Sequence, residues 1–286
     1  MLQNFSELGL KDDYLQAVEM LGYTRPTQIQ VETIPLMLSG RDVLAQSQTG
    51  TGKTAAFMLP ILQRLGKANG IPRALVLAPT RELAKQVADA TEGFARMSGV
   101  RALAVYGGQS YEVQIRALKR GVDVLVGTPG RLLDFIRQGR LDLSQVETLV
   151  LDEADEMLEM GFIEDVETIL NELTEVKQIA LFSATLPEQI HKLASKYLTD
   201  PAKISINPSR MTVVETEQRF YRVREETKLA ALCCLLETDD VTSGLIFTRT
   251  KARAQELADD LLRKGFSADS LHGDLKQARR EMVLNR

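Results

Sequence analysis

The chain has 286 residues, 44% of them hydrophobic and 26% charged, with a formal net charge of −4 and an isoelectric point near 5.5. This length accommodates one large or two medium domains with hydrophobic cores. No apolar run approaches the roughly 18 residues of a spanning helix, and residues 1–7 lack the basic start and apolar core of a signal peptide, so we expect a cytoplasmic protein without a membrane partner. The acidic balance excludes binding of nucleic acid through overall charge, so any such binding must be local.

The two cysteines are adjacent, at Cys233 and Cys234, within an apolar run of helical pattern. This placement indicates core packing in a reducing compartment, and we expect neither a metal site nor a redox site there.

The first 40 residues have a helical pattern that Pro26 and Pro35 interrupt, and from Arg41 the pattern becomes an alternation of strands and helices. The predicted strands are 42–45, 74–78, 102–106, 123–126, 148–151, 179–182 and 202–206. The predicted helices between them are 55–65, 81–97, 110–119, 130–138, 162–173 and 187–198. This order predicts an α/β fold with a parallel sheet covered by helices on both faces.

A turn-rich segment begins at Asn207, and we expect a first domain over 1–207, a linker over 208–216 and a second domain over 217–286. The predicted elements of the second domain are strands 219–223, 244–248 and 268–271 and helices 227–237, 251–264 and 276–284. A doubly wound domain usually has five or more strands, so we expect these residues to form only part of a domain.

A phosphate-binding loop is predicted at residues 47–54, between the strand at 42–45 and the helix that follows. In such a loop, backbone N–H groups surround the phosphates, Lys53 reaches the β and γ oxygens, and the Thr54 hydroxyl binds Mg²⁺. The strict pattern has glycine where this chain has Ser47, and the alternative is a Gly/Thr-rich surface turn. The strand before and the helix after favour the phosphate loop, whose predicted nucleotide contacts are Gln48, Thr49, Gly50, Thr51, Gly52, Lys53 and Thr54.

Three carboxylates lie within residues 152–155, directly after the predicted strand 148–151. The carboxyl ends of strands form the ligand crevice of an open α/β sheet. An acidic helix start is the alternative, because the helix dipole favours it. Beside a phosphate loop, however, Asp152 is predicted to hold Mg²⁺ and Glu153 to orient or deprotonate the attacking water.

Two other strands are followed by segments that combine a threonine, a helix start and an arginine, at 79–83 and 128–131. Such a helix start presents free N–H groups to a phosphate backbone. Each segment alone is typical of a capped helix, with Thr128 as the cap and Pro129 in the first turn. Two of them on one rim, with two glycines at 107–108 after a third strand, favour a track for a single-stranded polyanion.

The hydroxyls of Ser183 and Thr185 follow the strand 179–182, where we expect them to bridge the acidic cluster to the other domain. A simple cap of the helix that begins near Pro187 is the alternative.

Together these motifs resemble those of the DEAD-box RNA helicases of superfamily 2, and the resemblance spans essentially the whole chain. Residues 22–30 are similar to the family's Q motif, although Gln28 stands where the family commonly has proline, and Ser47 stands where it usually has alanine. Residues 245–248 resemble motif IV, and 272–274 resemble the next RNA-contacting segment. The remaining matches are 47–54, 79–83, 107–108, 128–131, 152–155 and 183–185.

The resemblance implies two RecA-like domains of the P-loop NTPase type, the second one partial, because motifs V and VI with their arginine fingers would lie beyond Arg286. It implies that Gln30 reads the adenine edge and selects ATP over GTP, with Phe5 and Tyr23 also in the nucleotide site. It implies that Asp155, Ser183 and Thr185 couple the domains. The implied RNA contacts are Pro79, Thr80, Arg81, Gly107, Gly108, Thr128, Pro129, Gly130, Arg131, Thr248, Gly273, Gln277 and Arg280.

The function implied is that of a monomeric ATP-dependent RNA helicase, with ATP and Mg²⁺ as cofactors and single-stranded RNA or a short duplex as the partner, within a ribonucleoprotein or during ribosome assembly. For these 286 residues we expect nucleotide binding with little hydrolysis, because an arginine finger contributes about 10³–10⁵ in rate. The alternatives are a DNA translocase of the same superfamily, a nucleotide-gated RNA clamp or scaffold, and a P-loop NTPase with another substrate.

Overall fold

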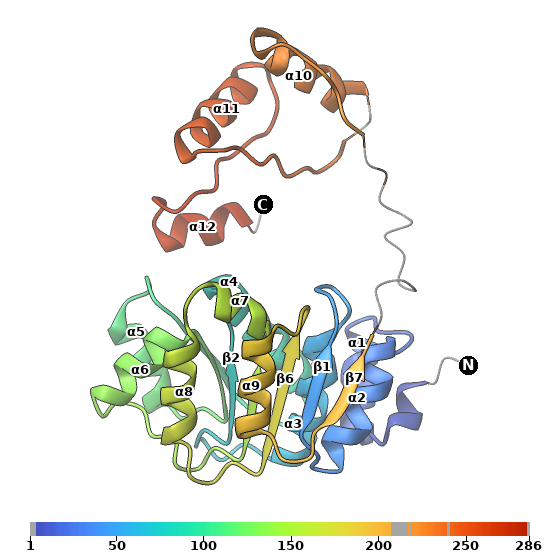
Figure 1. The fold of residues 1–286 in the computed structure, drawn as a ribbon, viewed down its shortest axis with the longest axis vertical. Coiled ribbons are helices and arrows are strands. Elements are labelled where there is room, and N and C mark those ends of the chain that lie inside the picture. Colours follow the sequence, from blue (N-terminus) through green and yellow to red (C-terminus); the bar gives the residue numbers. More distant parts are fainter. Residues whose placement is uncertain (1–3, 207–216, 218, 239–240, 285–286) are drawn as a thin grey trace. The chain divides into compact units, whose positions relative to one another are not determined.

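The computed structural model describes residues 4–206, 217, 219–238 and 241–284. The chain divides into two compact units, Met1–Val213 and Val214–Arg286 (Figure 1). The predicted linker 208–216 lies outside the described residues.

The first unit is built on a parallel sheet with the strand order β3-β4-β2-β5-β6-β1-β7. Apolar, mostly branched side chains fill the central strands, which are buried on both faces. All seven predicted strands are confirmed, with ends that shift by at most one residue. They are β1 Val43–Gln46, β2 Ala74–Leu77, β3 Ala102–Val105, β4 Val124–Gly127, β5 Thr148–Leu151, β6 Gln178–Ser183 and β7 Ala202–Ser205.

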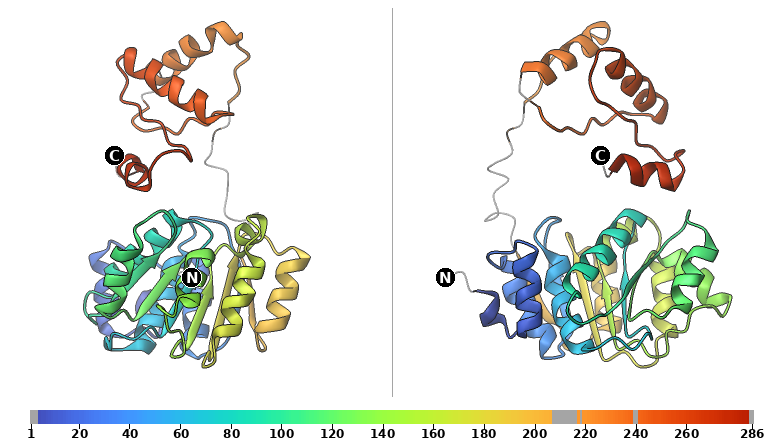
Figure 2. Two further views of the ribbon diagram at one scale, coloured as in Figure 1. Left: turned by 90° about the vertical axis from the view of Figure 1, so that its left-hand side faces the viewer. Right: turned by 180° about the vertical axis from the view of Figure 1, so that it is seen from behind.

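Helices cover both faces of this sheet, as the alternation predicted (Figure 2). One hydrophobic cluster packs helices α1 to α4 on Val43, Ala45 and Val76, and the other packs α6 to α9 on Leu44 and Leu75. Side chains of one strand therefore alternate between two cores. The helices are α1 Asp12–Met20, α2 Gln28–Leu38, α3 Lys53–Leu65, α4 Arg81–Phe94, α5 Tyr111–Lys119, α6 Pro129–Arg137, α7 Ala154–Glu159, α8 Ile163–Glu172 and α9 Glu188–Tyr197, preceded by the 3₁₀ turn η1 Phe5–Leu8.

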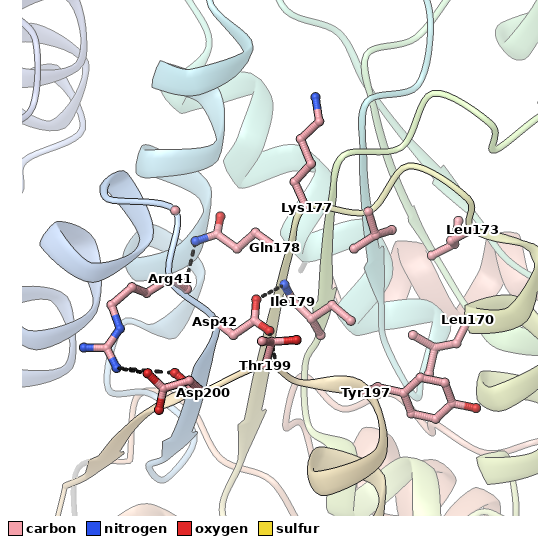
Figure 3. A pocket seen from close by; sticks show the side chains of 12 residues that line it. Arg41, Asp42, Leu170, Leu173, Lys177, Gln178, Ile179, Tyr197, Thr199 and Asp200 are labelled. Carbon is pink, nitrogen blue, oxygen red and sulfur yellow. Dashed lines mark hydrogen bonds and ion pairs between the residues drawn. The ribbon is translucent and has the colours of Figure 1, made fainter.

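Polar side chains tie the amino ends of three strands together beside a pocket of about 440 Å³ (Figure 3). The Asp42 carboxylate accepts hydrogen bonds from the backbone N–H groups of Ile179 and Thr199, each at 2.7 Å. The Gln178 amide donates to the carbonyls of Met37 (3.1 Å) and Arg41 (2.7 Å). These bonds set the register of β1, β6 and β7, and so align the functional loops at the opposite, carboxyl edge.

The second unit contains the helices α10 Lys228–Thr238, α11 Lys251–Arg263 and α12 Gln277–Leu284, after the turn η3 Glu225–Thr227. They confirm the predicted helices to within one residue. The strands predicted at 219–223, 244–248 and 268–271 are wrong, since the described part of this unit has no strand. A strand requires a ladder partner, and these apolar segments remain unpaired, with Phe220 and Phe247 about nine-tenths exposed (88% and 92%).

No helix among the described residues is both long enough and apolar enough to cross a membrane.

Candidate nucleotide and RNA site

The loop at residues 47–54 connects β1 to the first turn of α3, and its glycines are needed where they stand. Gly50 and Gly52 have φ angles of 77° and 90°, in the left-handed region that favours glycine. A Cβ atom on Gly52 would also lie only 2.5 Å from the Gln30 amide nitrogen. The loop therefore presents its backbone N–H groups at the N-terminus of α3, which is the geometry that binds phosphate.

Ser47, which stands where the family usually has alanine, is hydrogen-bonded within the loop. Its Oγ lies 3.3 Å from Thr51 Oγ1, and the Thr51 hydroxyl donates to the Gln48 carbonyl at 2.9 Å. Its N–H donates to the Ser183 carbonyl at 2.9 Å, which joins the loop to the end of β6. The side chain of Ser47 thus adds one hydrogen bond, with Thr51, that an alanine could not make, whereas the bond to Ser183 comes from the backbone.

Lys53 and Asp152 form a buried ion pair where β1 and β5 end. The Lys53 Nζ atom lies 3.9 Å from Asp152 Oδ1 and donates to the Ser47 carbonyl at 3.4 Å. The pKa of Asp152 is raised to about 6, chiefly by burial, with Lys53 opposing the shift and the nearby Glu153 adding to it. This long contact leaves the carboxylate poorly compensated, so a divalent cation beside it would relieve a real electrostatic cost.

Glu153 has a backbone conformation that few non-glycine residues adopt, with φ 52° and ψ 53°. It precedes α7, a six-residue helix that the sequence pattern did not predict because the helix is too short to show a period. Burial raises the pKa of Glu153, and Lys53 opposes this shift. Strain of this kind persists where the surrounding structure fixes a side chain for a task.

Asp155 connects α7 to the segment after β6. Burial raises its pKa, but hydrogen bonds from Thr185 and Ala184 outweigh this and lower it overall. The Thr185 N–H and hydroxyl both donate to Asp155 Oδ2 at 2.8 Å, and the Asp155 N–H donates to Ser183 Oγ at 3.2 Å. The alternative of a simple helix cap is wrong, because Pro187 occupies the N-cap position of α9, and Ser183 Oγ and the Thr185 hydroxyl are hydrogen-bonded to Asp155 instead.

The Q-like segment packs directly against the phosphate loop. The buried Gln30 amide accepts from the Thr27 N–H at 2.9 Å and donates to the Gly52 carbonyl at 3.1 Å. The structure thus gives Gln30 a bracing role, and its reading of adenine stays a prediction. Phe5 is buried in the core with its ring centre 6.3 Å from that of Tyr23, so its contact with nucleotide also stays a prediction.

The predicted RNA-binding segments follow β2, β3 and β4, three neighbouring strands of the sheet. Thr80 caps α4 by accepting from the Leu83 N–H at 3.2 Å, after Pro79. The Arg81 guanidinium lies so close to Gly108 that a Cβ atom there would overlap it, and Gly108 has a φ of 87°. Arg81 therefore joins the segment after β2 to Gly107 and Gly108 after β3.

The start of α6 supplies the third segment. Thr128 is the residue before the helix but makes no capping bond through its side chain, and Pro129 occupies the first turn beside the exposed Gly130. The Arg131 guanidinium is turned inward, where it donates to the Gln109 carbonyl at 3.2 Å and lies 3.9 Å from the centre of the Tyr111 ring. Direct contact of Arg131 with RNA therefore stays a prediction.

Sequence reasoning missed Gln109 and Tyr111 as parts of this site. The available signal was an aromatic residue at a predicted helix start, three positions after the glycine pair.

Two family models match the chain and together cover most of it. The model described as DEAD/DEAH box helicase matches residues 27–193, and the model described as Helicase conserved C-terminal domain matches residues 227–286. The chain belongs to the DEAD-box helicase family. The loop 47–54, the cluster 152–155 and the segment 183–185 all fall within the first match.

Curated DEAD-box relatives are similar to the chain over nearly its entire length. It is 50% identical over 283 residues to "ATP-dependent RNA helicase DeaD" of Escherichia coli, which covers 99% of the chain and 45% of that relative. It is 48% identical to "RNA helicase CrhR" of Synechocystis and 46% identical to "DEAD-box ATP-dependent RNA helicase CshA" of Geobacillus kaustophilus, with 58% and 61% of those proteins covered. The chain thus spans about half the length of these relatives.

Solved DEAD-box structures share the fold. A crystal structure of a DEAD box protein from Methanococcus jannaschii is 44% identical with a TM-score of 0.69, over 99% of the chain and 76% of that protein. A variant of S. cerevisiae Dbp5 bound to RNA and ADP BeF3 is 30% identical with a TM-score of 0.85, over 99% of the chain and 72% of that protein.

The second unit carries the remaining predicted RNA contacts of this DEAD-box chain. The Thr248 hydroxyl donates to the Thr250 carbonyl at 3.0 Å, and the buried Gln277 amide lies 3.3 Å from Glu281 at the start of α12. Gly273 lies before α12, and Arg280 lies within it. Contact of these four residues, Thr248, Gly273, Gln277 and Arg280, with RNA stays a prediction.

Proposed function

We propose that the protein is an ATP-dependent RNA helicase that uses Mg²⁺. The observation that carries this proposal is the buried ion pair of Lys53 and Asp152, in which Lys53 belongs to the phosphate loop and Asp152 directly precedes the strained Glu153. The names of the relatives, ATP-dependent RNA helicases, support it. Because the chain spans about half of those relatives, its activity and its substrate are inferences about the whole protein.

Several segments at the carboxyl edge of the sheet would hold the nucleotide. The N–H groups of the phosphate loop and the Lys53 ammonium bind the phosphates, and Gln30 selects adenine. Thr54, half-buried in the first turn of α3, and Asp152 would hold Mg²⁺, whose charge neutralises phosphate oxygens. Oxygen ligands of this kind suit that ion.

Hydrolysis depends on Glu153 and on groups of the second domain. The Glu153 carboxylate, with its raised pKa, orients the attacking water and accepts its proton. The hydrogen bonds that join Asp155 to Ser183 and Thr185 make the end of β6 respond to changes at the acidic cluster. We propose that the chain consists of a first domain at 1–207, a linker at 208–216 and a second domain at 217–286. The linkage through Asp155 would report the state of the nucleotide to the second domain.

RNA would bind along the ends of β2, β4 and β3. Helix starts and glycines meet phosphates and sugars rather than base edges, so we propose binding of single-stranded RNA or a short duplex with little sequence specificity. Closure with ATP then bends the strand and separates a short duplex locally, and hydrolysis releases it. We further propose a monomer that works on ribonucleoprotein substrates such as assembling ribosomes.

A nucleotide-selectivity experiment tests the proposal. Titration of the 286-residue chain with ATP and with GTP, each with Mg²⁺ and with or without a single-stranded oligoribonucleotide, should show preference for ATP and RNA affinity that rises with ATP. Turnover should stay low, because an arginine finger contributes about 10³–10⁵ in rate. Equal affinity for both nucleotides, or RNA affinity that ignores them, would refute the proposal, and robust turnover would refute its last part.

A further inference from the structure

We propose that Tyr111 is an RNA-stacking residue, whose ring receives a nucleobase at the outer end of the predicted RNA track. The inference rests on the proposed binding of RNA. It adds a base contact to a set that otherwise consists of phosphate and sugar contacts, and none of the predicted contacts includes this residue.

The position of Tyr111 follows from the sheet order. β3 is the edge strand, followed by β4 and β2, so the loops at the carboxyl ends of these strands lie in a row. Tyr111 begins α5, directly after the loop that leaves β3 through Gly107 and Gly108. Its ring centre lies 3.9 Å from the guanidinium carbon of Arg131, which stands in the first turn of α6. Tyr111 is therefore next to two predicted RNA segments and at the outer end of the row.

The ring is held in one orientation by three different contacts. The Arg131 guanidinium lies over it, and the Phe135 ring meets it edge-on at 5.5 Å with an interplanar angle of 69°. The hydroxyl donates to Asp134 Oδ2 at 2.9 Å, and this hydrogen bond raises the pKa of Tyr111, so the phenol stays a donor at neutral pH. Scattered exposed aromatic side chains are ordinary on protein surfaces, so what distinguishes Tyr111 is these three contacts and its position beside the RNA segments.

Tyr111 as a whole nevertheless remains 39% exposed. A fixed aromatic ring loses little conformational entropy on binding. The Arg131 guanidinium covers one side of the ring, so the base would stack on the opposite side. Stacking on an aromatic side chain strengthens binding by about five- to 150-fold per base and tolerates every base, because each has a π-face. Tyr111 would thus add affinity without sequence specificity and mark where the bound strand leaves the protein.

The test compares two substitutions of Tyr111 in the 286-residue chain, with a non-hydrolysable ATP analogue and a single-stranded oligoribonucleotide. Tyr111→Leu removes the π-face and keeps apolar bulk, and should weaken RNA binding about five- to 150-fold. Tyr111→Phe keeps the ring and loses only the bond to Asp134, and should stay within about threefold of the parent. Equal affinity of Tyr111→Leu and the parent for RNA overturns the proposal.

Abasic oligoribonucleotides separate stacking from a structural effect. Each base is removed in turn, and the penalty of Tyr111→Leu should disappear when one particular base is missing. A penalty that persists at every position shows that the ring acts only on the fold and overturns the proposal. Failure of the parent chain to bind any of these RNAs would instead refute the proposed function itself, together with this inference.

A fluorescent variant gives a second readout, because the chain contains no tryptophan. Tyr111→Trp should retain RNA binding, and its fluorescence should be quenched when RNA binds. Tyr197→Trp is the matched control: its ring lines the pocket at the opposite edge of the sheet, and RNA should leave its fluorescence unchanged. Binding without quenching at position 111, or equal quenching at both positions, overturns the proposal.

Discussion

The carboxyl edge of the sheet has two halves, which differ in the burial of their charged and backbone groups. The nucleotide half, at the ends of β1, β5 and β6, buries its charges, with Lys53 and Asp152 at 6% and 2% exposure. The RNA half, at the ends of β2, β3 and β4, leaves Gly108 and Gly130 exposed and turns the Arg131 guanidinium inward. The nucleotide half therefore has buried charges whose electrostatic cost a ligand would relieve. The RNA half instead exposes the backbone of its glycines, and the side chain of Arg131 is hydrogen-bonded within the protein.

The distribution of charge sharpens this contrast. Residues 141–176, which form β5, α7 and α8, contain 12 of the 39 acidic residues and no lysine or arginine. The rest of the chain then has 27 acidic residues against 35 basic ones, a net charge of +8. The acidic isoelectric point thus reflects this one segment, and it does not argue against local binding of a polyanion elsewhere.

The largest effect is expected at Glu153, where the nucleotide half performs chemistry. Glu153→Gln should lower RNA-stimulated ATP turnover about 10²–10⁴-fold, because the amide cannot accept a proton. Steady-state ATPase measurement on a form of the protein that turns over ATP provides the check. Glu156→Gln, on the exposed side of α7, is the control and should leave turnover unchanged. Equal losses in both variants would assign the effect to charge rather than to catalysis.

Lys53→Ala should weaken ATP binding about tenfold to 150-fold. Hydrogen bonds to charged groups contribute roughly 1.5–3 kcal/mol, and this substitution also leaves the buried Asp152 without its partner. Calorimetric titration with Mg²⁺ and ATP measures the change. Lys85→Ala, which breaks an exposed ion pair with Asp89 on α4, should retain the parent affinity. An unchanged affinity in Lys53→Ala would mean that the loop is not a phosphate site.

Alanine at a glycine should have opposite effects in the two halves. Gly52→Ala should destabilise the first unit by about 1–3 kcal/mol, because φ is 90° and the Cβ atom would collide with the Gln30 amide. Gly130→Ala meets no atom within 4 Å at the start of α6 and should stabilise by about 0.4–1 kcal/mol. Chemical denaturation followed by circular dichroism gives both values. Destabilisation of similar size in the two variants would remove the contrast.

The affinity for Mg²⁺ with ATP should decrease as the pH is lowered, because the Asp152 carboxylate, with a pKa of about 6, becomes protonated. A metal ion binds the ionised carboxylate, so protonation competes with it below that pKa, by up to about tenfold per pH unit. ATP itself takes up a proton in the same pH range, so the parent chain must be compared with Asp152→Asn. The measured quantity is the difference between the two proteins in the slope of log affinity against pH, from titrations between pH 5 and 8. Identical slopes would show that Asp152 is not a metal ligand.

The smallest effect is expected in the RNA half. Arg81→Ala should weaken RNA binding about fivefold and reduce the dependence of log affinity on log salt by about one unit, the signature of one lost phosphate contact. Affinity measured by fluorescence anisotropy at several salt concentrations provides the slope. Arg137→Ala, at the far end of α6, should change neither quantity. A weaker affinity with an unchanged slope would mean that Arg81 only positions the loop at Gly108.

The sequence by itself determined the first sheet, because seven apolar, branched segments alternate with amphipathic helices and βα order admits few arrangements. It also determined which residues stand at the strand ends, since phosphate loops and carboxylate pairs have fixed local spacing. It overestimated the second unit, where the segments predicted as strands have no ladder partners among the described residues and those at 219–223 and 244–248 are mostly exposed.

Only the tertiary structure decided how the side chains are used. The bond from Gln30 to the Gly52 carbonyl and the position of Arg131 over Tyr111 join residues 20 or more positions apart, and no local pattern encodes such pairs. The raised pKa of Asp152 likewise depends on burial at the meeting point of β1 and β5. Hydrogen bonds and desolvation act over a few ångströms in space rather than along the chain, so folding alone set the chemistry of residues that the sequence had already placed on one edge.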